Sequence, residues 1–281
     1  MSLSLSPAER APPRARPRRR KRPTLRQRLR RWRKQWRWAW RQFGRAPRPL
    51  RIAAGATTAL LLFAAANLAY HVVRKPAEML FPISGALSKL PAETWEQYAP
   101  LFREYATATI SPELLAALAQ VEGAGNPLAL TYWRWRLSWD PFAIYGPAST
   151  AVGMYQMTDG TFAEARRFCI RDHAVLEAGC RFNAFYTRLL PSDAVELAAV
   201  SLDRGVAAIL AHRRGRAPSA RQKDALAAVL HLCGGGPAAA FARHGFRFAP
   251  GERCGDHDPA VYLARVEAAR REFQRLAAAE P

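Results

Sequence analysis

The first 51 residues lack acidic side chains apart from Glu9, and this absence accounts for most of the charge of the chain. Residues 1–51 contain 19 of the 43 Lys and Arg residues and carry +18 of the net charge of +21. The other 230 residues carry only +3. The basicity therefore belongs to an N-terminal tail, and the rest of the chain lacks the charge excess typical of nucleic-acid-binding domains.

Residues 52–73 lack Lys, Arg, Asp and Glu altogether. A helix of this length is about 33 Å long at about 1.5 Å per residue, which is enough to cross a bilayer. A buried core helix and a cleaved signal peptide are the less favoured alternatives, the latter because the basic region before the run is unusually long. We expect an uncleaved membrane anchor, with residues 1–51 in the cytoplasm and residues 74–281 across the membrane.

The tail itself predicts a second membrane contact. Aromatic residues recur at helical spacing among Arg and Lys, and they are Trp32, Trp36, Trp40 and Phe43. Such a helix can lie in the headgroup layer, with anionic lipids as its partners. We expect this in preference to nucleic-acid binding or a purely solvated tail, and we expect residues 1–25, rich in Pro, Arg and Ser, to be disordered.

No cysteine lies in the tail or in the apolar run. The four cysteines, an even number on the translocated side, suit disulfides in an oxidising compartment, and they are Cys169, Cys180, Cys233 and Cys254. The sequence cannot choose among the possible pairings of four cysteines, and we expect the pairing between sequence neighbours, Cys169–Cys180 and Cys233–Cys254. A zinc set of two thiols with His231 and His257 is the alternative, although its spacing is unlike that of common zinc sites.

Beyond residue 74 the chain lacks alternating β-branched runs and internal repeats, which argues against a large sheet or a repeat protein. The apolar residues fall at spacings of three and four, so we predict an all-α domain over 93–281, joined to the membrane by a Pro-containing linker at 74–92. The predicted helices are 93–106, 112–122, 158–169, 174–190, 193–213, 220–233 and 259–278.

The helix at 112–122 is the best specified of these. Ser111 suits its N-cap, Pro112 suits its first position, and Gly123 suits its end. Glu122 stands in the last turn, on the face that carries Leu114 and Leu118. A helix C-terminus and an apolar surround both favour the protonated carboxyl, which is the form a general acid needs.

Two segments together resemble a known family. The stretch "SPELLAALAQVEGAGNPLA" (111–129), followed by "PASTAVGMYQMTDGTF" (147–162), is similar to the lytic transglycosylases of the lysozyme-like superfamily. "DALAAVLHLCGGGPAAA" (224–240) and "YLARV" (262–266) resemble later motifs of that family, so the resemblance covers about residues 93–275.

The resemblance implies a lysozyme-like fold in the periplasm of a bacterium, with peptidoglycan glycan strands as substrate. It places Glu122 at the catalytic position and Ser149, Gly153 and Gln156 in the second motif. In the family, the carboxyl protonates the bond between MurNAc and GlcNAc and then deprotonates the C6 hydroxyl, which leaves a 1,6-anhydro end. No nucleotide, organic cofactor or metal is implied.

The chain departs from the family pattern at several positions. Gly123 replaces a serine, and His231 stands where a supporting tyrosine is expected, so we expect His231 or Tyr155 to bond the carboxyl, with Tyr262 as a further site residue. A longer aromatic insertion separates the two main motifs, and its Trp139 and Tyr145 predict either a groove wall for glycan or packing against the core.

Three functions remain open at this point. The first is the transglycosylase, in which Gly153 would let sugar or the Glu122 carboxyl approach the backbone closely, and Gln156 would bond a sugar hydroxyl or N-acetyl group. The second is a muramidase that uses water, with Asp140 or Asp159 as its second carboxylate. The third is a non-catalytic peptidoglycan-binding anchor, a component of an envelope protein complex.

Overall fold

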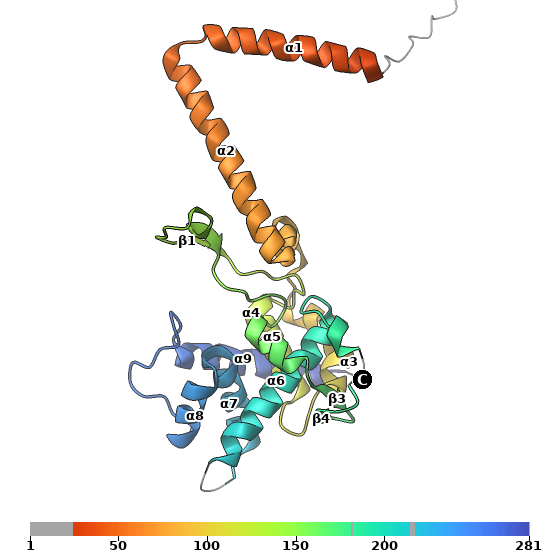
Figure 1. Cartoon of the computed structure of the whole chain (residues 1–281). Helices are drawn as coiled ribbons and strands as arrows, with labels where there is room; N and C mark the ends of the chain where they lie inside the picture. The colour runs from red at the N-terminus through yellow and green to blue at the C-terminus, as the bar shows by residue number, and fades with distance from the viewer. Residues whose placement is uncertain (1–24, 181, 214–216, 281) are drawn as a thin grey trace, which may run out of the picture. The chain divides into compact units, whose positions relative to one another are not determined.

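A computed structural model of the chain describes residues 25–180, 182–213 and 217–280. The expected disorder of residues 1–25 falls outside the described residues, except for Leu25. The chain divides into two compact units, Met1–Ala64 and Ala65–Pro281. The described residues are mostly helical with four short strands, which agrees with the all-α prediction at the level of class (Figure 1).

The N-terminal unit contains helix α1 (Leu25–Arg45) and the first part of helix α2 (Arg48–Arg74). On α1, the rings of Trp32 and Trp36 stack with their centroids 5.7 Å apart, and both side chains are exposed. The side chain of Trp40 lies outside the described part of the structure. Helix α2 is the one described helix that is long and apolar enough to span a membrane, with a mean hydropathy of 1.8.

The second unit contains the remaining elements. In chain order they are the 3₁₀ helix η1 (Pro76–Leu87), α3 (Pro91–Glu104), α4 (Pro112–Gly123), β1 (Trp133–Trp135), the 3₁₀ helix η2 (Pro141–Ala143), β2 (Tyr145–Pro147), α5 (Asp159–Ala165), β3 (Cys169–Arg171), β4 (Ala174–Leu176), the 3₁₀ helix η3 (Asn183–Phe185), α6 (Pro191–Ala211), α7 (Ala220–Cys233), α8 (Gly235–Arg243) and α9 (Pro259–Ala278).

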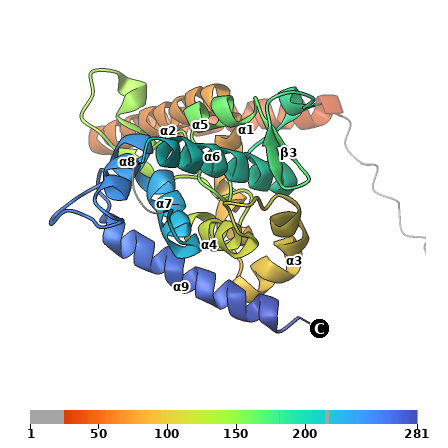
Figure 2. The same ribbon diagram turned by 90° about the horizontal axis from the view of Figure 1, so that it is seen from below.

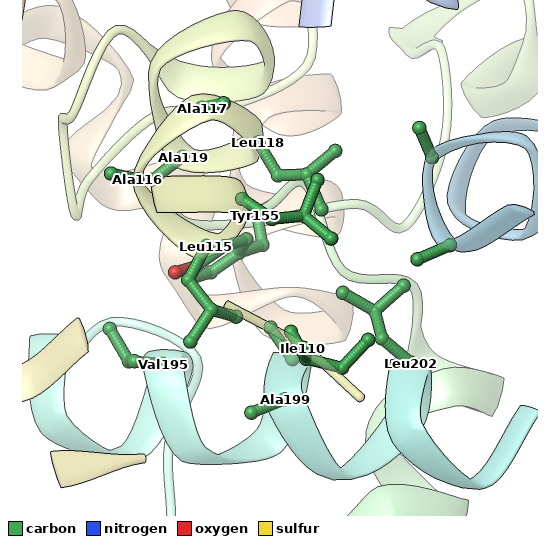
Figure 3. Packing of buried hydrophobic residues seen from close by; sticks show 14 of the residues in the cluster. Ile110, Leu115, Ala116, Ala117, Leu118, Ala119, Tyr155, Val195, Ala199 and Leu202 are labelled. Carbon is green, nitrogen blue, oxygen red and sulfur yellow. The ribbon is translucent and has the colours of Figure 1, made fainter. Parts of the chain in front are cut away.

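Helix α4 is central to this unit. It packs against α3, α6 and α9, and Figure 2 shows it between α6 and α9. Residues 114–119 are all buried, so α4 is apolar on every side rather than along one stripe. Its Leu115 and Leu118 pack with Val195 and Leu202 of α6, and the ring of Tyr155 lies among them (Figure 3).

Several local predictions differ from the structure. The segment 174–190 is not a helix but contains β4 and η3, and β4 pairs antiparallel with β3. The helix expected at 158–169 ends at Ala165, and α8 was not expected at all. The short strands escaped the sequence analysis because three residues are too few to establish an alternating pattern.

The segment 74–92, expected as a linker, is an ordered part of the second unit. Most of it forms η1, whose Glu78 is completely buried. The carboxylate of Glu78 pairs with Lys75 at 2.8 Å and accepts a hydrogen bond from Trp133 Nε1 at 2.8 Å. This paired charge fixes η1 against the β1–β2 hairpin.

Candidate active site

Glu122 lies in the last turn of α4, where the sequence places it. The Ser111 side chain caps the start of the helix by accepting a hydrogen bond from the amide of Leu114 at 3.2 Å. At the other end Ala124, not Gly123, adopts the left-handed conformation, with φ 51°, and its N–H bonds back to Ala119 and Gln120. The helix therefore ends immediately beyond Glu122.

Gly123 is needed for close approach rather than for turning. A Cβ at this position would stand 2.8 Å from Met154 Cα. The backbone of the 149–162 stretch thus passes directly over the end of α4, and a side chain at Gly123 would push the two apart. This contact explains a glycine where the resembled family has a serine.

Two side chains from distant elements approach the Glu122 carboxyl, and both reach the same oxygen. The hydroxyl of Tyr262 donates a hydrogen bond to Oε1 at 2.5 Å, and His231 Nε2 lies 3.7 Å from Oε1. The Glu122 side chain is 17% exposed, so it is accessible to a ligand yet largely shielded from water. Both contacts fall on Oε1 rather than on Oε2.

Tyr262 is held in position by the start of α9. Asp258 caps that helix by accepting hydrogen bonds from the amides of Ala260 and Val261. Burial raises the pKa of Tyr262 well above 10.0, and the neighbouring Glu122 charge and hydrogen bond raise it further. The phenol therefore remains a proton donor to Glu122 throughout the neutral range.

His231 stands in the last turn of α7, two residues before Cys233. Cys233 forms a disulfide with Cys254, so the end of α7 is tied to the loop that leads into α9 and Tyr262. The bond confirms the expected pairing and uses both thiols of the alternative zinc set. Cys169–Cys180, the second expected pair, also forms and links β3 to the loop after β4.

These residues help to line two hollows on the surface of the second unit. Glu122 and Arg265 line one of about 420 Å³, and His231 and Gln156 line the other, of about 400 Å³. The contact between Glu122 and His231 joins the linings of the two. Arg265 was missed by the sequence analysis, although its position three residues after Tyr262 puts both on one face of α9.

Gly153 and Gln156 make packing and hydrogen-bond contacts that the sequence analysis did not predict. Gly153 is buried at φ 81°, and a Cβ there would meet the Arg188 carbonyl oxygen at 2.2 Å. Gln156 Nε2 donates to the carbonyls of Ala129 and Gly153, each at 3.0 Å. Gly153 therefore allows the close approach of the Arg188 backbone, and Gln156, which lines the second hollow, also holds the backbone carbonyls of Ala129 and Gly153.

Tyr155 is not the partner of Glu122. Its ring is 1% exposed within the core between α4 and α6, and its hydroxyl has no hydrogen-bond partner in the described structure (Figure 3). Burial raises its pKa well above 10.0. The tyrosine that contacts Glu122 is Tyr262 of α9.

The other expected site residues lie elsewhere. Ser149 Oγ accepts a hydrogen bond from the amide of Ala151. Tyr145 packs on Trp135 in the β1–β2 hairpin, with ring centroids 4.7 Å apart, and Trp139 is fully exposed on the same hairpin. None of the three is among the described residues that line the two hollows.

The possible second carboxylates are also engaged away from Glu122. Asp140 accepts a hydrogen bond from the amide of Phe142 at 3.0 Å and so caps η2. Asp159 pairs with Arg188 at 2.6 Å, and its side chain is 64% exposed. Each residue thus has a local partner that accounts for its position.

No model of a known protein family matches this chain, and no curated protein sequence is significantly similar to it.

Proposed function

We propose that the protein is a membrane-anchored lytic transglycosylase that cleaves the MurNAc–GlcNAc bond of peptidoglycan, and that its helical unit has a lysozyme-like fold. One observation carries this proposal. The largely shielded carboxyl of Glu122 lies at the end of a buried helix, accepts a hydrogen bond from Tyr262 on one oxygen, and belongs to the lining of a hollow. The sequence resemblance assigns the catalytic role to the same residue.

The reaction needs one carboxyl group. Protonated Glu122 gives its proton to the glycosidic oxygen, and the bond from MurNAc C1 to that oxygen breaks with GlcNAc as the leaving group. The resulting carboxylate then takes the proton of the C6 hydroxyl of the same MurNAc, whose oxygen bonds to C1. The product is a 1,6-anhydro end, Glu122 regains its proton, and no water is consumed.

The surrounding residues act through position and charge. The Tyr262 hydrogen bond fixes the carboxyl, and it stabilises the carboxylate that forms after the first proton transfer. Gln156 and His231 bind sugar hydroxyl or N-acetyl groups in the second hollow. Arg265 supplies a positive charge for the acidic groups of peptidoglycan.

Three features support the proposed location in the cell. Helix α2 has the length and composition of a membrane span, and the positive-inside rule leaves the basic tail in the cytoplasm. The two disulfides suit an oxidising periplasm. The exposed Trp32 and Trp36 of α1, among Arg and Lys, suit binding to anionic lipid at the inner membrane.

The experiment is the Glu122→Gln variant of the full-length protein, assayed on purified peptidoglycan. We expect release of soluble glycan by the wild type and loss of nearly all release by the variant. Glu113→Gln is the matched control, because it makes the same chemical change in the first turn of the same helix. Unchanged release by Glu122→Gln would refute the catalytic assignment.

Product mass separates the remaining alternatives. A 1,6-anhydro end is lighter by one water than the reducing end that hydrolysis leaves, so wild-type products with hydrated ends would identify a muramidase instead. Binding of glycan without release, equal in the wild type and in Glu122→Gln, would identify a non-catalytic anchor of an envelope complex.

A further inference from the structure

The β1–β2 hairpin is bound to the end of α2 by two polar side chains of that helix. Asn67 Nδ2 donates a hydrogen bond to the Tyr145 carbonyl at 2.8 Å, and His71 Nε2 donates to the Phe142 carbonyl at 2.9 Å. Asn67 is only 3% exposed. Asparagine and histidine are costly in an otherwise apolar span unless they find partners, and here the hairpin backbone provides them.

Ring packing strengthens the same junction. Tyr70 stacks on Phe142 with centroids 4.7 Å apart, and His71 meets the ring of Trp133 edge-on at 5.0 Å. A Cβ on Gly146 would stand 2.7 Å from the His71 ring, so this close approach requires the glycine. Polar and aromatic contacts together make a single docking face between α2 and the hairpin.

A second set of contacts holds the base of the hairpin to the segment after α2. Trp133 donates to the buried Glu78 of η1, and Glu78 pairs with Lys75. Lys75 Nζ also donates to the Ala151 carbonyl at 3.1 Å. The hairpin is therefore held at both the helix end and the segment that follows it.

The docking face lies inside the apolar run. Asn67 and His71 precede Val73, the last residue of that run, by six and two positions, which is about 9 and 3 Å at about 1.5 Å per residue. Aromatic belts and interfacial segments occupy this depth of a bilayer, about 5–10 Å into the headgroup and acyl boundary. A hairpin docked here is at the level of the lipid headgroups when α2 spans the membrane.

The free side of the hairpin has the composition of such a layer. Trp135, Leu137 and Trp139 are 73%, 109% and 103% exposed. Arg134, which lies between the two tryptophans of β1, is exposed as well. Large apolar side chains fully open to water mark a surface that another phase or molecule covers. Trp and Arg side by side suit the lipid interface, where the ring is immersed and the guanidinium meets phosphate.

We propose that the β1–β2 hairpin, clamped to α2, inserts Trp135, Leu137 and Trp139 into the headgroup layer of the leaflet that faces the helical unit. The hairpin then forms a further membrane contact, on the opposite side of the bilayer from the basic tail. This contact holds the unit that contains Glu122 against the bilayer surface. The phospholipid interface is the occupant, in place of the glycan that the aromatic insertion alone suggested. This proposal does not depend on catalysis by Glu122.

A labelled cysteine tests the insertion. Because all four native cysteines are in disulfides, Leu137→Cys provides a single reactive thiol for an environment-sensitive fluorophore such as NBD. The full-length labelled protein is reconstituted into vesicles of phosphatidylcholine and phosphatidylglycerol, with or without lipid that carries a quencher near the headgroup. We expect the emission of the label to shift to the blue in vesicles, and we expect the quencher lipid to remove most of the emission intensity.

Two controls make the result specific. Ala211→Cys, exposed at the end of α6 away from the hairpin, carries the same label and should show neither the shift nor the quenching (Figure 1). Gly146→Val in the Leu137→Cys background forces a side chain against His71, and it should reduce the quenching by displacing the hairpin from α2. Co-flotation with vesicles verifies that every variant is in the membrane.

The outcomes that overturn the proposal are equally direct. Emission from position 137 that equals that of position 211, with no quenching, would show that the hairpin stays in water. A response to soluble peptidoglycan fragments without a response to quencher lipid would assign the hairpin to glycan. Quenching that Gly146→Val leaves unchanged would refute the clamp to α2.

Discussion

The hydroxyl of Tyr262 donates a hydrogen bond of 2.5 Å to Oε1 of Glu122, although 140 residues separate the two along the chain. The bond joins the first turn of α9 to the last turn of α4, two helices that pack closely along their lengths. Any change in how these helices pack would therefore move the phenol relative to the carboxyl. The catalytic proposal rests on this arrangement, and it can be tested at each of its parts.

Tyr262→Phe removes the hydroxyl and preserves the ring. A hydrogen bond to a charged group contributes about 1.5–3 kcal/mol, so we expect kcat to fall by about 10–100-fold at about 1.4 kcal/mol per factor of ten, with KM little changed. Glycan release at several substrate concentrations measures both constants. Tyr155→Phe, which removes a hydroxyl that does not contact Glu122, should keep wild-type kcat, and an unchanged kcat in Tyr262→Phe would contradict the assignment.

Tyr155→Phe should not lower the stability of the protein. The Tyr155 hydroxyl is buried without a partner, and a buried unsatisfied polar group costs about 1–3 kcal/mol. Removing it should therefore leave the free energy of unfolding at neutral pH unchanged or raise it by about 1 kcal/mol. Urea unfolding of the full-length protein in detergent measures this, and a loss of more than about 1 kcal/mol would indicate a hydrogen bond that the hydroxyl makes in solution.

The buried phenols also predict an alkaline limit. The pKa of Tyr155 and that of Tyr262 are raised well above 10.0 in the folded protein, mainly by burial. The unfolded chain releases these protons near pH 10, while the folded chain retains them. Their contribution to stability is therefore complete below pH 10, and it is lost as the pH rises towards the folded pKa.

We expect the free energy of unfolding to decrease above pH 10, and to decrease less steeply in Tyr155→Phe because one raised pKa is gone. Unfolding curves of both proteins at a series of alkaline pH values provide the comparison. Equal slopes would mean that Tyr155 is not shielded from solvent in the folded state.

Gly153→Ala tests the backbone packing beside the site. Gly153 has φ 81°, and a Cβ would come within 2.2 Å of the Arg188 carbonyl oxygen. Strain and overpacking of this kind cost about 1–3 kcal/mol each, so we expect a clear loss of stability in urea unfolding. Gly160→Ala in α5, where a Cβ meets nothing within 4 Å, is the matched control and should be neutral or stabilising.

The two disulfides should differ in their effect on activity. The sequence separation is 11 residues for Cys169–Cys180 and 21 residues for Cys233–Cys254. Replacing both cysteines of either pair by serine should therefore lower the stability by about 3 kcal/mol. Only Cys233–Cys254 ties the end of α7, with His231, to the loop before α9, with Tyr262. We therefore expect a lower kcat in Cys233→Ser/Cys254→Ser than in Cys169→Ser/Cys180→Ser at a temperature where both are folded, and equal values would contradict this.

Strong local signals made parts of the structure predictable. The Ser111 cap and Pro112 fix where α4 begins, and both act within one helical turn. The absence of charge over residues 52–73 marks α2, since a membrane span depends on composition and length alone. The two disulfides are the expected pairs, because the cysteines that are close in the sequence are also close in space.

Other parts depend on contacts between distant residues. Segment 174–190 has helical spacing in its sequence, yet it forms β4 and η3, where Asn183 bonds the carbonyls of Arg166 and Phe168. The roles of Gly123 and Gly153 come from backbones that approach from Met154 and Arg188. A sequence shows that a side chain is missing, but not which atoms occupy the space.

The sequence by itself determined a basic tail, an apolar run of membrane length, a mostly helical second unit and Glu122 at a helix end, because each depends on residues within a few turns of one another. Only the tertiary structure decided that Tyr262, and not Tyr155, donates a hydrogen bond to Glu122, and that the aromatic insertion docks on α2. Those outcomes depend on α9 packing against α4 and on the polar side chains of Asn67 and His71 finding carbonyl partners 78 and 71 residues away. Such pairings depend on the arrangement of the whole core and have no local pattern in the chain.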